Sequence, residues 1–551
     1  MTAIGRFRFW VFACAVLLPS GAVAAEPADL LLSNGKIVTV DGRFSIARAV
    51  AIKGERIVAV GDAAAVAKWR GPGTRVIDLK GRTVIPGLID NHAHYVHASA
   101  HWDYEVRLDG ITSRKEAVER LRARAKVLKP GEWLLVVGGW IEEQFQDSRR
   151  PFTREELDDI APANPAMVTR IFGNLFLNSR ALAAYGIDEK APDPRGGRIV
   201  RDADGKPTGE IVGGTFTMLD SLPKQALEKH IAGARAMSAE LNRHGITAFL
   251  DASWPTISDI YFEGWRRLVR DGEARARLFY MTYISPETPE AAEQAVARIA
   301  ALKHFQGDHW IDNVGYGETV YRPLHDNLLA KEAKPRPDQL ALWGKIAAAL
   351  AQNSITMHVH ATLTGSINGF LDEVEKVHAV RPIKNLRWTF AHLDQVDGGQ
   401  LERMKKLGIY AAIHSRPTIQ GVLMHNVHGD RAYDMPPLRL IRDSGIRWGL
   451  GTDATIVTPV SPFITLGWAV TGRMVGGFKV TNQTIGREDA LIAYTRSNAY
   501  FLFQESNLGS IEPGKLADLV VLDRDYLTVP AETIKDLRPV MTLVGGKVVF
   551  Q

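Results

Sequence analysis

The feature that most constrains the fold is an alternation of apolar, strand-like runs with helix-patterned segments, repeated along most of the chain. Residues 337–353 and 399–408, for example, have a helical pattern and lie between such runs. Eight strand–helix units in succession predict an α/β fold, a (β/α)8 TIM-type barrel. The eight strand-like runs cover residues 83–94, 244–253, 276–285, 312–321, 354–362, 386–394, 408–417 and 446–454.

The two ends of the chain have a different pattern, in which short alternating strands are joined by tight turns. Asn34-Gly35 and Gly54-Glu55 mark such turns near the start, and Gly545-Gly546 marks another near the end. Neither end has enough strands to bury a core alone. We therefore expect residues 26–83 and 508–551 to form one small antiparallel β-sandwich.

The barrel is expected to extend over residues 84–507. A long stretch, residues 100–235, separates its first two strands and contains an amphipathic helix in 113–128 and a strand in 132–140. We interpret it as an insertion over the barrel mouth, where loops form lids and substrate pockets.

Residues 1–25 have the three-part pattern of a secretory signal peptide: Arg6 and Arg8 without an acid, an apolar run, and small residues up to Ala24. The run is too short to span a bilayer comfortably, so we expect cleavage and an exported, periplasmic protein. Cys14 is the only cysteine, and a mature chain without it has no disulfide framework. The net charge is +5, and the basic residues do not gather in one stripe along the sequence. This distribution argues against nucleic-acid binding. No membrane association is expected after signal removal, and a homo-oligomer is compatible with the sequence.

Polar side chains occur where the expected barrel strands end. His92 and His94 lie two positions apart, so both imidazoles can point to one site. A lone His-x-His pair is more often structural, but His358 and His360 form a second pair at another strand end. Imidazoles combined with carboxylates favour zinc or a related divalent ion. The strand-end set consists of His92, His94, Glu318, His358, His360, His392, His414 and Asp453.

Asp453 ends a buried strand among small neighbours in GLGTDA. A carboxylate beside a divalent cation can bind it, accept a proton from water and pass that proton to a leaving group. The alternative is an aspartate that only caps the helix beginning near Ser461. We expect Asp453 to be a metal ligand and the catalytic general base.

These residues lie in motifs that resemble the amidohydrolase superfamily, in the amidohydrolase 3 or YtcJ-like group that includes N-substituted formamide deformylase. The motifs, which span essentially the whole mature chain, are NGKIVTVDG, VIPGLIDNHAH, HVHA, WTFAHLDQV, GLGTDA and LGSIEPGKLADLVVLDRD. The resemblance implies one or two divalent metals per chain, with zinc preferred. It also implies the ligand set His92, His94, Glu318, His360, His392 and Asp453.

Two departures from the family pattern leave questions open. The fourth strand has no lysine that could be carboxylated to bridge two metals, and Glu318 could either bridge or contact substrate instead. The fifth strand, HATLTG from His360, lacks the acid that usually follows its histidine. The number of metals and the substrate side of this strand therefore stay open.

The leading hypothesis is hydrolysis of a non-peptide, amide-type C–N bond in a small-molecule substrate. The same groups would serve ester, lactone or carbamate hydrolysis, and metal-assisted decarboxylation or hydration is a further alternative. A non-catalytic exported metal-binding protein would leave Asp453 without a task. The candidates for substrate contacts are Tyr95, Trp140, His414 and Arg416.

Overall fold

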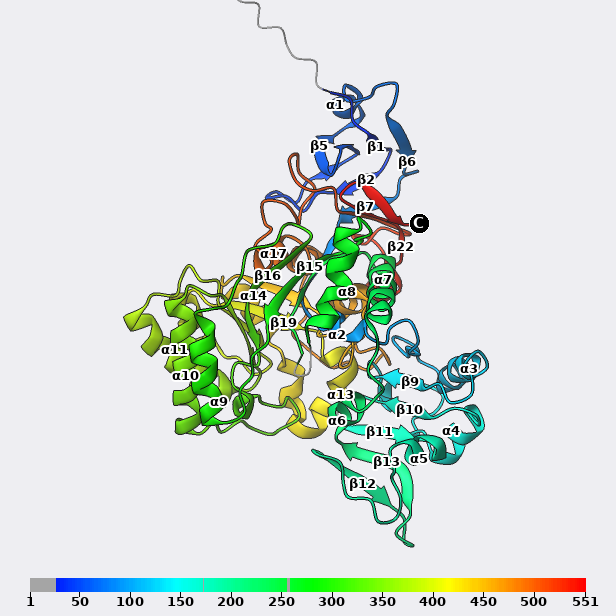
Figure 1. The fold of residues 1–551 in the computed structure, drawn as a ribbon. Helices are drawn as coiled ribbons and strands as arrows, with labels where there is room; N and C mark the ends of the chain where they lie inside the picture. The colour runs from blue at the N-terminus through cyan, green and yellow to red at the C-terminus, as the bar shows by residue number, and fades with distance from the viewer. Residues whose placement is uncertain (1–25, 172, 255–257) are drawn as a thin grey trace, which may run out of the picture.

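The computed structural model describes residues 26–171, 173–254 and 258–551, in which eight parallel strands form a nearly closed barrel (Figure 1). Each strand pairs with the next one along the chain, from β8 to β20. The predicted (β/α)8 fold is thus confirmed, whereas the predicted signal peptide lies outside the described residues. The strands are β8 (Leu88–Ala93), β14 (Ile246–Asp251), β15 (Arg277–Thr282), β16 (Ile311–Glu318), β17 (Met357–Ala361), β18 (Thr389–His392), β19 (Tyr410–His414) and β20 (Trp448–Gly451).

Helices surround the barrel and bury an apolar face against it or against each other. In α10 (Pro337–Gln352) and α11 (Thr364–Val380), Trp343 and Phe370 stack with ring centroids 4.7 Å apart. The other helices of this layer are α7 (Leu227–Arg243), α8 (Asp259–Arg270), α9 (Pro289–Ile299), α12 (Gly398–Leu407), α13 (Pro417–His428), α14 (Leu438–Asp443), α15 (Pro462–Thr471), α16 (Arg487–Ala493) and α17 (Arg496–Phe501).

The seam between β8 and β20 is closed by hydrogen bonds at its carboxyl end. The Asp453 amide donates to the His92 carbonyl at 2.9 Å, and the His94 amide donates to the Ala454 carbonyl at 2.8 Å. Further down, the Asn498 side chain donates to carbonyls of both strands. The first and last strands therefore place their polar ends side by side.

Two sheets lie above the barrel (Figure 1): one is formed by the N-terminal end of the chain, and the other combines strands from both ends. The four-stranded sheet has the order β5-β4-β1-β6, and the six-stranded sheet has the order β23-β22-β21-β7-β2-β3. Leu32 and Ile52 from the first sheet share a core with Val84 and Leu519 from the second. The strands are β1 (Leu30–Ser33), β2 (Lys36–Val38), β3 (Ile46–Ala47), β4 (Ala49–Lys53), β5 (Arg56–Gly61), β6 (Arg75–Asp78), β7 (Thr83–Pro86), β21 (Leu519–Leu522), β22 (Pro539–Val544) and β23 (Lys547–Phe550).

The expectation of a purely antiparallel unit is wrong, because β1 pairs with β6, and β2 with β7, in parallel. Asn34-Gly35 joins β1 to β2, which lie in different sheets, so it carries the chain across the sandwich instead of closing a hairpin. Gly54-Glu55 and Gly545-Gly546 do close antiparallel hairpins.

The segment between β8 and β14 contains a sheet of its own, of order β12-β13-β11-β10-β9. Figure 1 shows it at the end of the barrel opposite the sandwich. Only β9 (Leu134–Val137) and α3 (Arg114–Ala125) were expected; the other four strands of this sheet were not. They are β10 (Ala166–Thr169), β11 (Asn174–Leu177), β12 (Gly197–Arg201) and β13 (Pro207–Gly213). Within the described residues, no helix is long and apolar enough to cross a membrane.

Candidate metal centre

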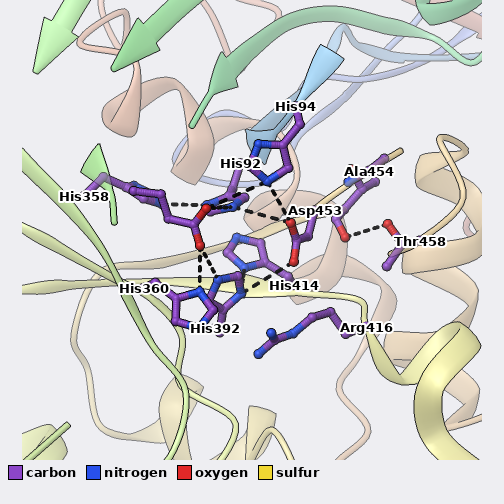
Figure 2. A network of polar contacts seen from close by, with 12 residues as sticks. His92, His94, His358, His360, His392, His414, Arg416, Asp453, Ala454 and Thr458 are labelled. Atoms are coloured by element: carbon purple, nitrogen blue, oxygen red, sulfur yellow. Dashed lines mark hydrogen bonds and ion pairs between the residues drawn. The ribbon is translucent and has the colours of Figure 1, made fainter. Parts of the chain in front are cut away.

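The structure brings the strand-end residues together at the carboxyl end of the barrel, where TIM barrels hold their active sites. Figure 2 shows His92, His94, His360, His392 and Asp453 converging on one small volume. His392 and Asp453 have φ angles of 77° and 67°. Left-handed backbone in non-glycine residues is strained, and such strain concentrates at functional sites.

Four side-chain atoms form the candidate donor set: Nε2 of His92, Nε2 of His94, Oε2 of Glu318 and Oδ1 of Asp453. Of these residues, His92, His94 and Glu318 have ligand atoms that all lie within 4.8 Å of one another. Glu318 Oε2 lies 3.7 Å from His92 Nε2 and 3.8 Å from His94 Nε2. Asp453 Oδ1 lies 3.5 Å and 3.1 Å from the same two nitrogens. Ligands about 2.1 Å from a zinc ion in a tetrahedron are about 3.4 Å apart. The donor set therefore fits a divalent metal.

The buried Nε2 of His92 has no hydrogen-bond partner among the described residues. A buried nitrogen left unpaired is unfavourable unless something outside the protein chain satisfies it. Because His92 faces two carboxylates and a second imidazole, a cation is the partner that this position favours.

The second oxygen of Glu318 faces a different pair of histidines. Its Oε1 lies 2.6 Å from His360 Nδ1 and 3.0 Å from His392 Nε2. The carboxylate thus stands between two groups of nitrogens, with one oxygen toward each. This is the arrangement that a bridging carboxylate requires.

Two further histidines, His358 and His414, lie behind His92 and His392 and orient their rings. His358 Nε2 lies 2.8 Å from His92 Nδ1, and His414 Nδ1 lies 2.7 Å from His392 Nδ1. Burial lowers the pKa of both His358 and His414 well below the usual value, so both are neutral and each can accept a hydrogen bond at one ring nitrogen. His92 and His392 can then donate from Nδ1, which leaves Nε2 of each free to bind a metal. The structure thus places His358 beside a candidate ligand.

Asp326, which sequence reasoning missed, supports His360. Its Oδ1 lies 2.9 Å from His360 Nε2, and it also accepts a hydrogen bond from the Leu363 amide at 2.8 Å. This loop carboxylate reaches the end of β17, where HATLTG has no acid. Its position after a barrel strand was the only available signal, and many loop acids share that signal. His325 stacks on His360 with ring centroids 3.8 Å apart and was missed for the same reason.

A cavity of about 220 Å³ opens beside Glu318, His360 and Asp453. Of the four candidates for substrate contacts, only Arg416 lines it. His414 lies behind His392, as described above. The expectations for Trp140 and Tyr95 disagree with the structure, as both side chains are fully buried elsewhere.

Trp140 packs on Phe145 and donates from Nε1 to the Thr169 carbonyl at 3.0 Å. Tyr95 packs on Phe249 and donates to Asp90 Oδ2 at 3.0 Å. Both rings are core residues with a satisfied polar atom. Asp453 does not cap the following helix, because Ser461 is the N-cap residue of α15.

Residues 75–550 match the model of the amidohydrolase family. The chain belongs to this family. Of its length, 98% aligns at 27% identity with 94% of Protein LONG AFTER FAR-RED 3 of Arabidopsis thaliana. The N-substituted formamide deformylase of Arthrobacter pascens is also 27% identical, over 94% of this chain and 97% of that protein. The resemblance inferred from the motifs is confirmed, and the protein is a metal-dependent amidohydrolase.

A solved structure of an uncharacterized metal-dependent hydrolase from Pyrococcus horikoshii OT3 has a TM-score of 0.65 and 21% identity. The likeness covers 91% of this chain and 99% of that one. It shows that the amidohydrolase shares the fold of that protein.

The charges of the amidohydrolase site balance in pairs. Burial opposes ionisation of Glu318, but the His92 charge and hydrogen bonds from His360 and His392 hold its pKa well below the usual range. Asp453 is likewise buried, and the adjacent imidazoles of His92 and His94 lower its pKa. Burial alone would lower the pKa of His94 and of His360. Asp453 instead raises the pKa of His94 to about 9. Asp326 and Glu318 raise the pKa of His360 to about 9. Without a metal, the carboxylates therefore hold the imidazoles of His94 and His360 in their charged form.

Proposed function

We propose that this amidohydrolase cleaves a non-peptide, amide-type C–N bond with Asp453 as general base. The observation that carries the proposal is the position of the Asp453 carboxylate, which both belongs to the four-atom donor set and lines the substrate cavity. The family and its hydrolase relatives support the bond type.

We further propose that the resident metal is zinc, held by His92, His94, Glu318 and Asp453. Imidazole nitrogens and carboxylate oxygens at tetrahedral separations suit zinc better than the oxygen-only ions magnesium and calcium. When bound, such an ion lowers the pKa of a water toward neutrality and polarises the substrate carbonyl.

The side chains of the chain perform the proton transfers. Asp453 is ionised because its pKa is low, so it can accept a proton from the attacking water. The water oxygen bonds to the carbonyl carbon, the C–N bond breaks, and Asp453 returns the proton to the departing nitrogen. The products are a carboxylic acid and an amine. Trp254 and Val457 give the cavity wall an apolar part beside these groups.

The number of metals depends on Glu318, whose two oxygens face separate groups of nitrogens. We propose that it bridges two ions, the second held by His360 and His392. Mass spectrometry of the purified protein should then find two metals per chain, and fewer in Glu318→Ala. One metal in both proteins would instead assign Glu318 to substrate or proton handling.

The test of the general base uses Asp453→Asn, which keeps the size of the side chain. N-substituted formamides are the first substrates to try, because a relative is named for them. Turnover should fall by at least about 100-fold, the usual contribution of a general base. Asp434→Asn, a change in an exposed residue, is the matched control. Unchanged turnover in an Asp453→Asn protein that still holds metal would contradict the assignment.

We also propose export to the periplasm, supported by the pattern of residues 1–25. Intact-mass measurement of the protein from a periplasmic fraction should show cleavage after Ala24 or Ala25. A full-length mass, with the protein retained in the cytosol, would contradict the proposal.

A further inference from the structure

The segment inserted between β8 and β14 contacts the wall of the active-site cavity from behind. The side chains that line the cavity come from the ends of barrel strands and from the loops that follow them. Among the described residues of this wall, none belongs to the insertion, residues 100–235. The loop after β20, residues 452–461, contributes Asp453, Ile456 and Val457 to the wall. This loop is where the insertion and the active site meet.

An apolar core joins the inserted sheet to the cavity wall. Trp254, Ile456 and Val457 line the cavity and belong to one buried cluster with side chains of the sheet. The members of this cluster from β9, β10, β11 and β13 are Leu135, Val137, Met167, Leu175, Leu177 and Ile211. Protein interiors are close-packed, so a change of volume on one side of such a wall is felt on the other. The sheet therefore supports the cavity wall without touching a substrate.

A polar clasp, formed by Arg107 and Asp109, holds the same loop. Arg107 Nη2 donates to Asp109 Oδ1 at 2.7 Å and to the Thr455 carbonyl at 2.8 Å. Asp109 Oδ2 accepts from the Val460 amide at 3.2 Å. Arg107 Nη1 donates to the Val137 carbonyl at 2.9 Å, which anchors the clasp to β9. Hydrogen bonds with an ionised partner are the stronger kind, so the loop is held on both sides of its two apolar wall residues.

Two glycines just after β9 let the sheet approach the loop. Gly138 and Gly139 have φ angles of 69° and 75°, a region that glycine adopts without steric cost. A Cβ atom at Gly138 would lie 2.6 Å from the Ile456 Cα. The Gly139 amide donates to the Ile456 carbonyl at 2.7 Å. The Gly-Gly pair before Trp140 thus serves the contact with the loop after β20.

We propose that the insertion positions the loop 452–461 and so sets both the placement of Asp453 and the width of the substrate cavity. This inference rests on the proposed role of Asp453 as general base. Arg107 and Asp109 are positioning residues, because they contact the loop and do not line the cavity. The apolar face of the inserted sheet determines which substrates fit, because it supports the cavity wall from behind.

The clasp is tested with Asp109→Asn at saturating zinc. The amide removes one acceptor of the Val460 N–H, while Glu105, 3.0 Å from Arg107 Nη1, keeps the guanidinium paired. Hydrogen exchange measured by mass spectrometry should become at least about 10-fold faster in residues 454–461. With N-butylformamide as substrate, kcat should fall by up to about 100-fold at unchanged KM, because Asp453 is displaced.

The matched control for the clasp is Asp159→Asn, because Asp159 is an exposed acid that pairs with Arg122 inside the insertion. It should change neither the exchange of the loop nor kcat. Arg107→Lys should keep part of both, since lysine retains the charge but cannot donate from a fork. Unchanged exchange in Asp109→Asn, or faster exchange with unchanged kcat, would overturn the positioning role of the clasp.

The width of the cavity is tested with Met167→Ala, which removes a fully buried side chain behind the wall. The ratio of kcat/KM for N-butylformamide to that for N-methylformamide should rise about 10-fold, as a hydrophobic pocket discriminates by a few methylenes. Met404→Ala on α12 removes an equally buried methionine from a different core and should leave the ratio unchanged. An unchanged ratio in Met167→Ala would overturn the role of the sheet in substrate size.

The two readouts separate this inference from the proposed function. If the zinc-loaded protein hydrolyses neither formamide, the proposed C–N hydrolysis fails for this substrate class. The exchange of residues 454–461 then decides alone: faster exchange in Asp109→Asn supports the clasp, and unchanged exchange overturns it. Hydrolysis of both formamides, with unchanged exchange and an unchanged ratio in the variants, would overturn the inference and support the hydrolase.

Discussion

Asp326 illustrates how much of this site depends on residues that do not face the metal position. Its carboxylate lies 2.9 Å from His360 Nε2 as an ion pair, its backbone carbonyl lies 2.9 Å from the same nitrogen, and His360 Nδ1 faces Glu318. Partners of this kind orient ligands and raise their basicity, and their loss weakens metal binding about 10- to 100-fold. We expect Asp326→Asn to lower zinc affinity by this factor, measured by competition with a chelator. Asp338→Asn, an exposed change, should have no effect. Full affinity in Asp326→Asn would show that His360 needs no such support.

The raised pKa values of His94 and His360, each about 9, predict how metal binding depends on pH. A protonated imidazole has no lone pair for a metal, so below pH 9 binding must displace a proton from each histidine. Zinc affinity should therefore rise with pH, by up to about two decades per pH unit below pH 9. Buffered-zinc titrations between pH 6.5 and 9 measure this slope. Asp326→Asn should reduce the slope, because it removes a group that raises the pKa of His360. A flat profile would contradict the assignment of both histidines.

At the scale of elements, the barrel seam depends on one side chain of α17. Asn498 donates to the Ile89 carbonyl of β8 and to the Leu450 carbonyl of β20, both at 2.6 Å, and accepts from Asn91 at 3.0 Å. Leucine at this position fills similar space but leaves these buried groups unpaired. Asn498→Leu should lower the free energy of unfolding by about 3 kcal/mol. Urea denaturation at a fixed zinc concentration measures the loss, and Asn353→Leu on the exposed end of α10 is the control. An equal effect of both substitutions would contradict the role of the seam.

The helices and strands also show which parts of the fold could be predicted from the sequence and which could not. The barrel strands are apolar along their length and end in histidines or acids, so both the fold and the strand-end candidates could be predicted. Strands β10–β13 of the inserted sheet were not predicted; in β12 (GRIVR) and β13 (PTGEIVG), glycine, proline and charged residues interrupt the apolar pattern. Trp140 and Tyr95 were misplaced because an aromatic residue near a strand end has the same sequence signature in a core as in a pocket.

The site itself was predicted where the ligand follows directly from a strand, and missed where it comes from a loop. Asp326 and His325 reach the centre only because the chain turns back after β16, and this path is set by tertiary packing.

At the scale of the whole molecule, one buried ion pair joins the barrel to the sandwich. Arg277 of β15 donates from Nε and Nη2 to the two oxygens of Asp518, which precedes β21, both at 2.9 Å. Asp518 also accepts from the Gly545 amide at 2.8 Å, and the guanidinium lies 4.2 Å from the centroid of the Trp310 ring. Removing one charge of such a pair leaves the other buried and uncompensated, which costs about 3–5 kcal/mol.

This contact predicts an order of stability among variants. Asp518→Asn should lower the free energy of unfolding by about 3–5 kcal/mol, because the fully buried Arg277 keeps its charge. The double variant Arg277→Met with Asp518→Leu replaces the pair by apolar groups, and it should recover most of that loss. Urea denaturation of the zinc-loaded proteins gives all three values. A double variant less stable than Asp518→Asn would mean that two hydrogen bonds, and not the charge balance, hold the sandwich on the barrel: that from the Gly545 amide to Asp518 and that from Arg277 Nη1 to the His309 carbonyl at 3.1 Å. The expected order would instead show that the pair fixes how these two parts dock, while apolar burial supplies most of the stability.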